Sequence, residues 1–321
     1  GELWQIVLFD RTGRSYGNHA EVLGVSPDFE AGSGFVPRRD FVSANLFNRF
    51  SWYGRPGALV EQATTFFGPR VFWRYDDFFD LKSSFEGSFS DAWQLTLRGG
   101  WSASAEILNR HQRFDSLDYA AYAVDAGGTP FAMPHGLYHV WSVNTGVNTP
   151  NRALTLAVNV GTGETPIFAE AARGRGWSAE LSGAWHPTES IRVEGSWVHL
   201  RIDRARDGSR FSTADIPRLK LEYQLSRAIF FRYVGQYFAQ QRDALRDPRS
   251  GAPLVIDSVP QPRVTNTDFR NDFLFSYKPT PGTVFFFGYG SSMSEPTAFS
   301  FRDLQRTADG FFLKASYLFR M

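Results

Sequence analysis

The sequence predicts an all-β fold, a transmembrane antiparallel up-and-down β-barrel of about 14 to 18 strands. Segments of about ten residues that alternate apolar and polar side chains follow one another along the chain. Short turns and long loops alternate between these segments. The sequence has no run of about 18 apolar residues, the length that a membrane-spanning helix needs. Aromatic residues make up 16% of the 321 residues, which suits strands better than helices.

Alternation with a period of two is the first observation. It is clearest at residues 93–104, where Trp93, Leu95 and Leu97 are apolar and the residues between them are polar. A register shift of one residue would turn charged side chains towards lipid, so the alternation specifies the register of each strand. The same pattern occurs at residues 177–185, 191–197, 219–225, 229–237, 273–278 and 311–320.

The sorting of the connections by length is the second observation. Short turns on one rim and long loops on the other are typical of outer-membrane barrels, in which the short turns are periplasmic and the long loops extracellular. Short turns are predicted at residues 54–57, 90–91, 149–151, 186–189, 226–227 and 278–282, and long loops at 106–137, 162–175, 204–213, 241–266 and 294–306.

Fifteen strand segments are predicted, whereas bacterial single-chain barrels have an even number of strands. Either one segment is misread, or one or more strands lie upstream of Gly1. The abrupt start favours the second, so we expect residues 1–321 to be a single barrel domain and the C-terminal part of a longer protein. The segments lie near 2–11, 18–28, 39–53, 58–74, 76–89, 92–105, 138–149, 151–161, 176–186, 190–203, 214–226, 228–240, 267–278, 282–293 and 307–320.

Charged residues of both signs fall at positions predicted to face the barrel lumen. A barrel of this size is wide enough for an aqueous channel unless a loop or domain plugs it, and mixed charges predict weak ion selectivity. The predicted lumen-lining residues are Lys82, Glu86, Arg98, Glu180, Arg192, Glu194, Lys220, Glu222, Arg232, Arg270, Asp272 and Lys314.

Aromatic residues near the segment ends predict interfacial girdles, in which a ring lies among lipid headgroups with its polar tip in water. Stacking against sugars is the alternative for these rings. The predicted girdle residues are Trp52, Trp73, Trp93, Trp101, Trp177, Trp185, Tyr277 and Tyr317.

The composition excludes several classes of function. A net charge of +1, from 34 basic and 33 acidic residues spread along the chain, gives no basic stripe for nucleic acid. The absence of cysteine excludes disulfides and thiolate metal sites, and we expect no metal and no cofactor.

The stretch Phe114–Tyr119, followed by Asp125, lacks the spacing of a calcium loop and is predicted to be solvated. Residues 161–164 are glycine-rich but precede no helix, so we expect a turn there.

The six histidines do not form a convincing catalytic pattern. His139 and Ser142 are three residues apart, which places them on opposite faces of a strand. His199 shares the lipid-facing parity of Trp197 near the outer rim, and His186 is predicted in a turn. We therefore expect that the chain is not an enzyme, although catalytic groups can also be brought together across strands.

Two regions resemble a known family. Residues 28–38, which include Gly34-Phe35-Val36-Pro37-Arg38, resemble the Gly-Phe-Val-x-Arg signature of an uncharacterised family of bacterial outer-membrane barrel domains. Residues 218–226, 271–272, 277–283 and 310–321 are similar to the C-terminal part of that family, so the resemblance spans nearly the whole chain. It implies a barrel of no established activity, often found behind a module like the family-nine carbohydrate-binding domains, which would lie before Gly1. The last strand also resembles the outer-membrane assembly signal, although Arg320 and Met321 follow its terminal Phe319.

These observations predict a protein of the bacterial outer membrane that acts as a pore or membrane anchor, with lumen charges and external loops that determine what passes or binds. One alternative is a barrel enzyme acting on lipid or glycan, and another is a structural or adhesive component of a surface complex. The expected partners are outer-membrane lipid and lipopolysaccharide, the barrel-assembly machinery during insertion, and an upstream domain or subunits of a surface complex.

Overall fold

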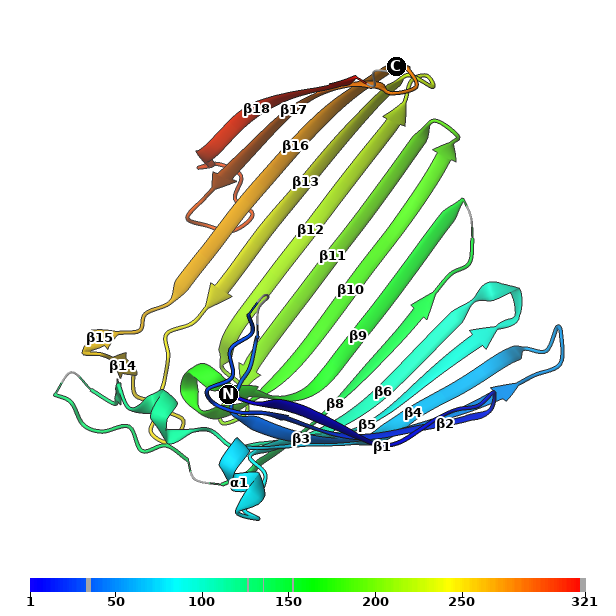
Figure 1. Cartoon of the computed structure of the whole chain (residues 1–321). Coiled ribbons are helices and arrows are strands. Elements are labelled where there is room, and N and C mark those ends of the chain that lie inside the picture. Colours follow the sequence, from blue (N-terminus) through cyan, green and yellow to red (C-terminus); the bar gives the residue numbers. More distant parts are fainter. Residues whose placement is uncertain (33–35, 126, 135, 152, 318–321) are drawn as a thin grey trace.

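The computed structural model describes residues 1–32, 36–125, 127–134, 136–151 and 153–317. Fifteen strands form one antiparallel sheet in which neighbours in space are consecutive along the chain, apart from three two-residue strands that lie outside it (Figure 1). This confirms the predicted all-β, up-and-down fold. The sheet contains β1 (Leu3–Thr12), β2 (Tyr16–Val25), β3 (Phe41–Tyr53), β4 (Val60–Trp73), β5 (Glu86–Leu97), β6 (Ser102–Gln112), β8 (Tyr138–Asn148), β9 (Leu154–Ile167), β10 (Ala172–Thr188), β11 (Ile191–Arg204), β12 (Arg210–Gln224), β13 (Ile229–Arg242), β16 (Val264–Thr280), β17 (Thr283–Ser294) and β18 (Gln305–Tyr317).

The register gives the sheet two chemically distinct faces. Residues paired across strands share a face, so a row of pairs follows one face from strand to strand. One row pairs Trp185 with Val193, Val193 with Leu221 and Leu221 with Tyr233, and it defines the apolar face. The neighbouring row pairs Ala184 with Glu194 and Glu194 with Lys220, and it belongs to the polar face. The predicted alternation therefore survives in three dimensions.

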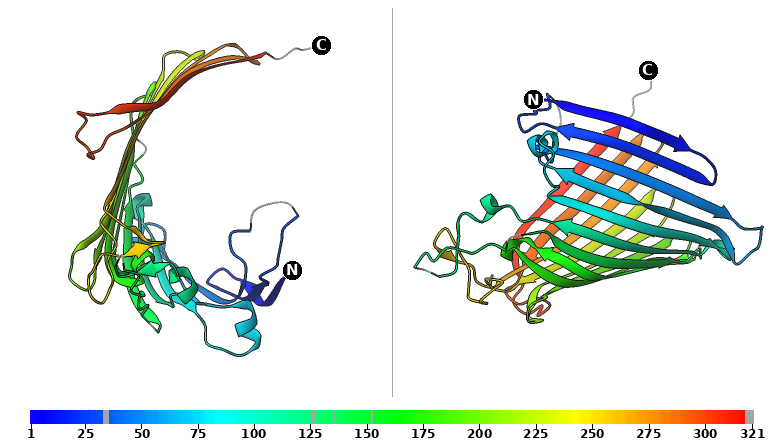
Figure 2. Two further views of the ribbon diagram at one scale, coloured as in Figure 1. Left: turned by 90° about the vertical axis from the view of Figure 1, so that its left-hand side faces the viewer. Right: turned by 90° about the horizontal axis from the view of Figure 1, so that it is seen from below.

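The sheet bends into an open arc (Figure 2). Among the described residues, β1 pairs only with β2 and β18 only with β17, so these two strands are the edges. The arc is consistent with the wall of a barrel, but the wall does not close on itself. The remainder of the strand predicted at 307–320, with Phe319 of the resemblance to an assembly signal, lies outside the described residues, as do Gly34 and Phe35 of the signature.

The connections separate into a turn rim and a loop rim, as the sequence predicts. The turn rim, defined by the connections 13–15, 54–59, 98–101, 149–153, 189–190, 225–228 and 281–282, joins strands by short turns. The loop rim, on the opposite edge, is defined by the connections 26–40, 74–85, 113–137, 168–171, 205–209, 243–263 and 295–304.

Two predicted boundaries are wrong, the first because the alternation runs through a tight turn. Residues 90–91, predicted as a turn, lie inside β5, and the turn falls at the 3-10 segment Arg98–Gly100. Gly99 and Gly100 have φ of 80° and 84°, a region that glycine adopts readily, and the period of two continues across them into β6. The segment predicted at 76–89 begins instead as the short helix α1 (Tyr75–Phe79).

Other strands are longer than predicted. β9 and β10 extend through most of the predicted loop 162–175, so residues 161–164 lie within β9 and not in a turn. His186 likewise lies in β10. Among the residues described, no helix is long and apolar enough to span a bilayer.

The loop rim carries packed structure that the sequence analysis did not predict. β7 (Tyr122–Ala123), β14 (Val255–Ile256) and β15 (Val259–Pro260) form a small sheet that joins two loops far apart in sequence. Phe114 and Tyr119 are buried next to it, whereas Ser116, Leu117, Asp118 and Asp125 are exposed, so the stretch predicted as solvated is solvated except for these two aromatic rings. Phe114, Tyr119 and Ala171 form a buried apolar cluster, and all three lie in loop-rim connections outside the strands of the large sheet.

Candidate functional site

A group of charged side chains crosses β11 and β12 on the polar face. We call Arg192, Glu194, Lys220 and Glu222 the charged ladder. The Arg192 Nε lies 2.6 Å from the Glu194 Oε1, and the Lys220 Nζ lies 3.5 Å from that oxygen and 2.9 Å from the Glu222 Oε1. Acidic and basic residues face each other because the register pairs Glu194 with Lys220 and Arg192 with Glu222.

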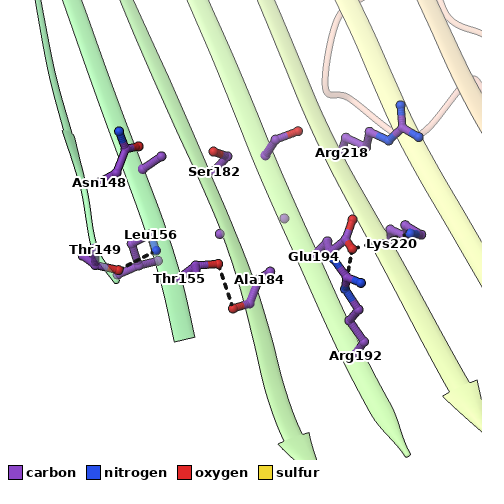
Figure 3. A pocket seen from close by; sticks show the side chains of 14 residues that line it. Asn148, Thr149, Thr155, Leu156, Ser182, Ala184, Arg192, Glu194, Arg218 and Lys220 are labelled. Carbon is purple, nitrogen blue, oxygen red and sulfur yellow. Dashed lines mark hydrogen bonds and ion pairs between the residues drawn. The ribbon is translucent and has the colours of Figure 1, made fainter. Parts of the chain in front are cut away.

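The ladder is open to solvent. Its side chains are 21% to 48% exposed, with Glu222 the least and Arg192 the most exposed. Arg192, Glu194 and Lys220 border a hollow of about 380 Å³ whose other walls include Asn148 and Ser182 (Figure 3). Solvent and dissolved ions can therefore reach charges of both signs at this part of the wall.

Further charges extend the polar face beyond the ladder. Arg232 on β13 is paired with Glu222 in the register, and the Arg270 Nε lies 2.7 Å from the Asp268 Oδ2 on β16. The Arg218 Nη1 donates to the Gln236 Oε1 over 3.3 Å. The charged part of the polar face thus reaches from β11 to β16.

The polar face of β5 to β10 has a different character. It carries mostly amides and hydroxyls, and a hollow of about 480 Å³ lies over them. The two carboxylates that line this hollow are Glu106 and Glu180, and the Asn144 Nδ2 donates to the Glu106 Oε2 over 3.4 Å. The neutral residues of the lining include Gln94, Ser104, Asn144, Asn159 and Ser178.

Most of the predicted lumen-lining residues lie on the polar face. Glu180, Arg192, Glu194, Lys220, Glu222, Arg232, Arg270, Asp272 and Lys314 share its rows, and Glu86 begins β5 on the same face.

Two of the predictions fail because these residues are not on strands. Lys82 follows α1 in a loop-rim connection, where its Nζ lies 2.8 Å from the Asp77 Oδ1 and 3.1 Å from the Asp80 Oδ2. The hydrogen bonds that the Lys82 ammonium donates to these carboxylates raise its pKa. Arg98 lies in the turn that follows β5. Both residues belong to the rims of the sheet.

The predicted aromatic residues lie towards the two rims on the apolar face. Trp52 stacks on Trp93 with ring centroids 5.9 Å apart, and both lie on the turn-rim side of their strands. Trp101 lies in the turn before β6 rather than on a strand. Of the remaining residues, Trp185, Tyr277 and Tyr317 lie near the turn rim, and Trp73 and Trp177 near the loop rim.

A buried ion pair at the loop rim was not predicted. We call Glu170 and Arg204 the clasp. Glu170 is 1% and Arg204 is 4% exposed, and the Arg204 Nη2 lies 2.6 Å from the Glu170 Oε1. Arg204 also donates to the carbonyl of Ala244 over 2.8 Å, and the Arg246 N–H donates to Glu170 over 2.9 Å. The clasp therefore ties together connections 168–171 and 243–263 at the end of β11.

One histidine ring lies within hydrogen-bond distance of a serine hydroxyl, because the Ser84 Oγ is 3.2 Å from the His111 Nε2. His139 pairs with His111, while Ser142 pairs with Leu108 on the other face, as the spacing predicts. His199 has a partner that the sequence analysis missed, because its Nδ1 lies 2.8 Å from the Asp215 Oδ1 on β12. The residues paired with His199 across the strands are Ala179 and Asp215, and neither carries a hydroxyl.

Within the described ranges, no group of three or more histidine, aspartate or glutamate side chains is placed to hold a metal ion. Comparison of the chain with protein-family models, curated proteins and solved structures finds no match. The resemblance to a barrel family therefore stays a prediction, as does the expectation that the chain is not an enzyme.

Proposed function

We propose that this chain is the wall of a bacterial outer-membrane barrel and that its polar face lines an aqueous pore. The observation that carries the proposal is the division of the sheet into an apolar and a charged face. Leu181 is 41%, Phe273 51% and Phe311 71% exposed on the apolar face. Apolar surface that continues across many strands is costly in water but is satisfied by hydrocarbon.

The strand lengths support membrane insertion. A transmembrane strand needs about 9 to 11 residues. The shortest strands of the sheet, such as β1, have 10 residues, and the longest, β10 and β16, have 17. Each strand is therefore long enough to cross the hydrocarbon region, with aromatic residues near both rims at the depth of the headgroups.

The polar face keeps hollows of about 380 and 480 Å³ and its charges are accessible to solvent, which is compatible with a wall that lines water. Charges of both signs in the ladder favour weak ion selectivity.

The pore can be tested with two adjacent residues of β10. Ser182 faces the hollow beside the ladder, and Leu181 lies on the apolar face. Because the chain has no cysteine, Ser182→Cys and Leu181→Cys each introduce a single thiol. In planar bilayers we expect stepwise conductance, and a charged, membrane-impermeant thiol reagent should reduce it for S182C but not for L181C. Protein that inserts yet never conducts, or conductance that responds equally at both positions, would contradict the proposal.

A second candidate is a structural component of a surface complex, which the packed loop rim favours. Leu81 is 92% and Leu117 81% exposed there, and the connection that carries Leu117 also contributes β7 to the small sheet. Purification in detergent decides between the two. A partner bound in stoichiometric amount, and lost when both leucines are changed to serine, would support the structural role.

A further inference from the structure

The two edges of the sheet run in the same direction. β1 leads into the short turn 13–15, so it runs from the loop rim to the turn rim. β18 follows the loop-rim connection 295–304, so it also runs from the loop rim to the turn rim. Direct pairing of β1 with β18 would therefore be parallel. Every pair of neighbours within the described sheet is antiparallel, and the open side of the arc separates the two edges (Figure 2).

We propose that β1 and β18 do not pair with each other and that an odd number of further strands of the same polypeptide, at least one, completes the barrel between them. This inference rests on the proposed membrane function, because hydrocarbon offers no partner for the backbone groups of an open edge. Only an odd number of inserted strands is antiparallel to both edges. An even number would leave one parallel pair, as direct closure does.

The connectivity of the sheet favours the same polypeptide as the source. Consecutive strands are neighbours throughout the large sheet, with a connection at one rim. A strand antiparallel to β1 ends at the loop rim, where β1 begins, and a strand antiparallel to β18 begins at the turn rim, where β18 ends, so a strand joined to either edge by one connection continues this pattern. A second copy is a poor occupant, because copies inserted in one orientation present edges that all run from the loop rim to the turn rim.

The residues of the two edge strands also indicate the sequence pattern of the inserted strands. Ile6 on β1 and Leu313 on β18 lie in rows of the apolar face, and Lys314 lies in a row of the polar face. Ile6 is 52% and Leu313 is 77% exposed, so both edges leave apolar side chains uncovered. The missing strands should therefore alternate apolar and polar residues in the same way.

Disulfide cross-linking of the full-length protein in outer membranes tests the arrangement. Neighbouring strands lie about 4.8 Å apart, within the reach of a disulfide, whereas one inserted strand separates the edges by roughly 10 Å. Ile6→Cys is combined in turn with Phe311→Cys, Leu313→Cys and Ala315→Cys, so that the unknown stagger is covered. Phe287→Cys with Leu313→Cys is the matched control, because these residues are paired in β17 and β18 in a row of the apolar face. We expect the control to cross-link on oxidation and all edge pairs to remain reduced. Efficient cross-linking of any edge pair would overturn the proposal.

A second measurement identifies the occupant. A benzophenone amino acid placed at Leu313 is photo-activated, and the captured peptide is sequenced by mass spectrometry. Capture of a segment of the same molecule outside residues 3–317 is expected, whereas capture of another protein or of a second copy would overturn the inference. Cross-linking reports strand neighbours and not ion flow, so a barrel that fails to conduct would contradict the pore without affecting this result.

Discussion

The clasp and the charged ladder contain the same chemical groups in opposite surroundings. In the clasp, Glu170 and Arg204 are almost completely buried, and both are also bonded to backbone groups of neighbouring connections. In the ladder, Arg192 and Glu194 are 48% and 30% exposed at the same 2.6 Å separation. Distance alone therefore does not distinguish them, and burial does.

Burial changes what each ion pair can do. Removal of one partner from a buried pair leaves an uncompensated charge and costs about 3 to 5 kcal/mol. An exposed pair contributes only about 0 to 1 kcal/mol, because water screens its attraction. We conclude that the clasp organises the loop rim, while the ladder contributes little to folding and remains available to solutes.

The largest expected effect is the loss of the clasp. Arg204→Met should lower the free energy of unfolding by about 3 to 5 kcal/mol, because Glu170 remains buried without its partner. Reversible unfolding in lipid vesicles measures this change, and limited proteolysis should detect faster cleavage in connections 168–171 and 243–263.

The double variant Glu170→Leu with Arg204→Met is the control for the clasp. Replacement of both charges by apolar residues removes the unpaired carboxylate, so it should recover most of the lost stability. A double variant as unstable as R204M would show that the lost packing, and not the unpaired charge, causes the effect.

The clasp also shows why some features of the molecule could be predicted from the sequence and others could not. The two faces follow from local periodicity, so the sequence alone assigns Glu194 and Lys220 to the polar face. Glu170 and Arg246 are 76 residues apart, and their contact depends on how two loops fold, which leaves no periodic signal. The tight turn at Gly99 misled the prediction for the opposite reason, because the period of two continued through it.

An intermediate effect is expected at the loop-rim connection 295–304. Glu295 is 5% exposed and accepts hydrogen bonds from the Tyr237 hydroxyl, the Ser300 hydroxyl and the Phe301 N–H, the latter two over 2.7 and 2.8 Å. Burial acts to raise the pKa of Glu295, but these hydrogen bonds outweigh it and lower the pKa below its usual 4.5. A carboxylate whose pKa is lower in the folded than in the unfolded state stabilises the fold at pH values above the unfolded-state pKa. This contribution is lost as the pH falls through the folded-state pKa.

We therefore expect connection 295–304 to be held at neutral pH and to loosen below about pH 4.5. Hydrogen exchange at the Phe301 amide should accelerate on acidification. Glu295→Gln should accelerate this exchange at neutral pH and remove its dependence on pH. Exchange that accelerates equally in wild type and E295Q on acidification would assign the loosening to another group.

The smallest effect on stability is expected in the ladder, where the consequence is instead a change in ion selectivity. Glu194→Gln and Lys220→Gln should each change the free energy of unfolding by less than about 1 kcal/mol, because both side chains are partly solvated. A unit charge about 7 Å from an ion in water contributes roughly 0.6 kcal/mol, which is about a threefold change in relative permeability. E194Q leaves excess positive charge and should shift the reversal potential in a salt gradient towards anions, whereas K220Q should shift it towards cations. The two variants remove opposite charges from one ion pair, so a structural disturbance common to both would shift both reversal potentials in the same direction. Shifts in opposite directions are expected only if these charges line the path of the ions.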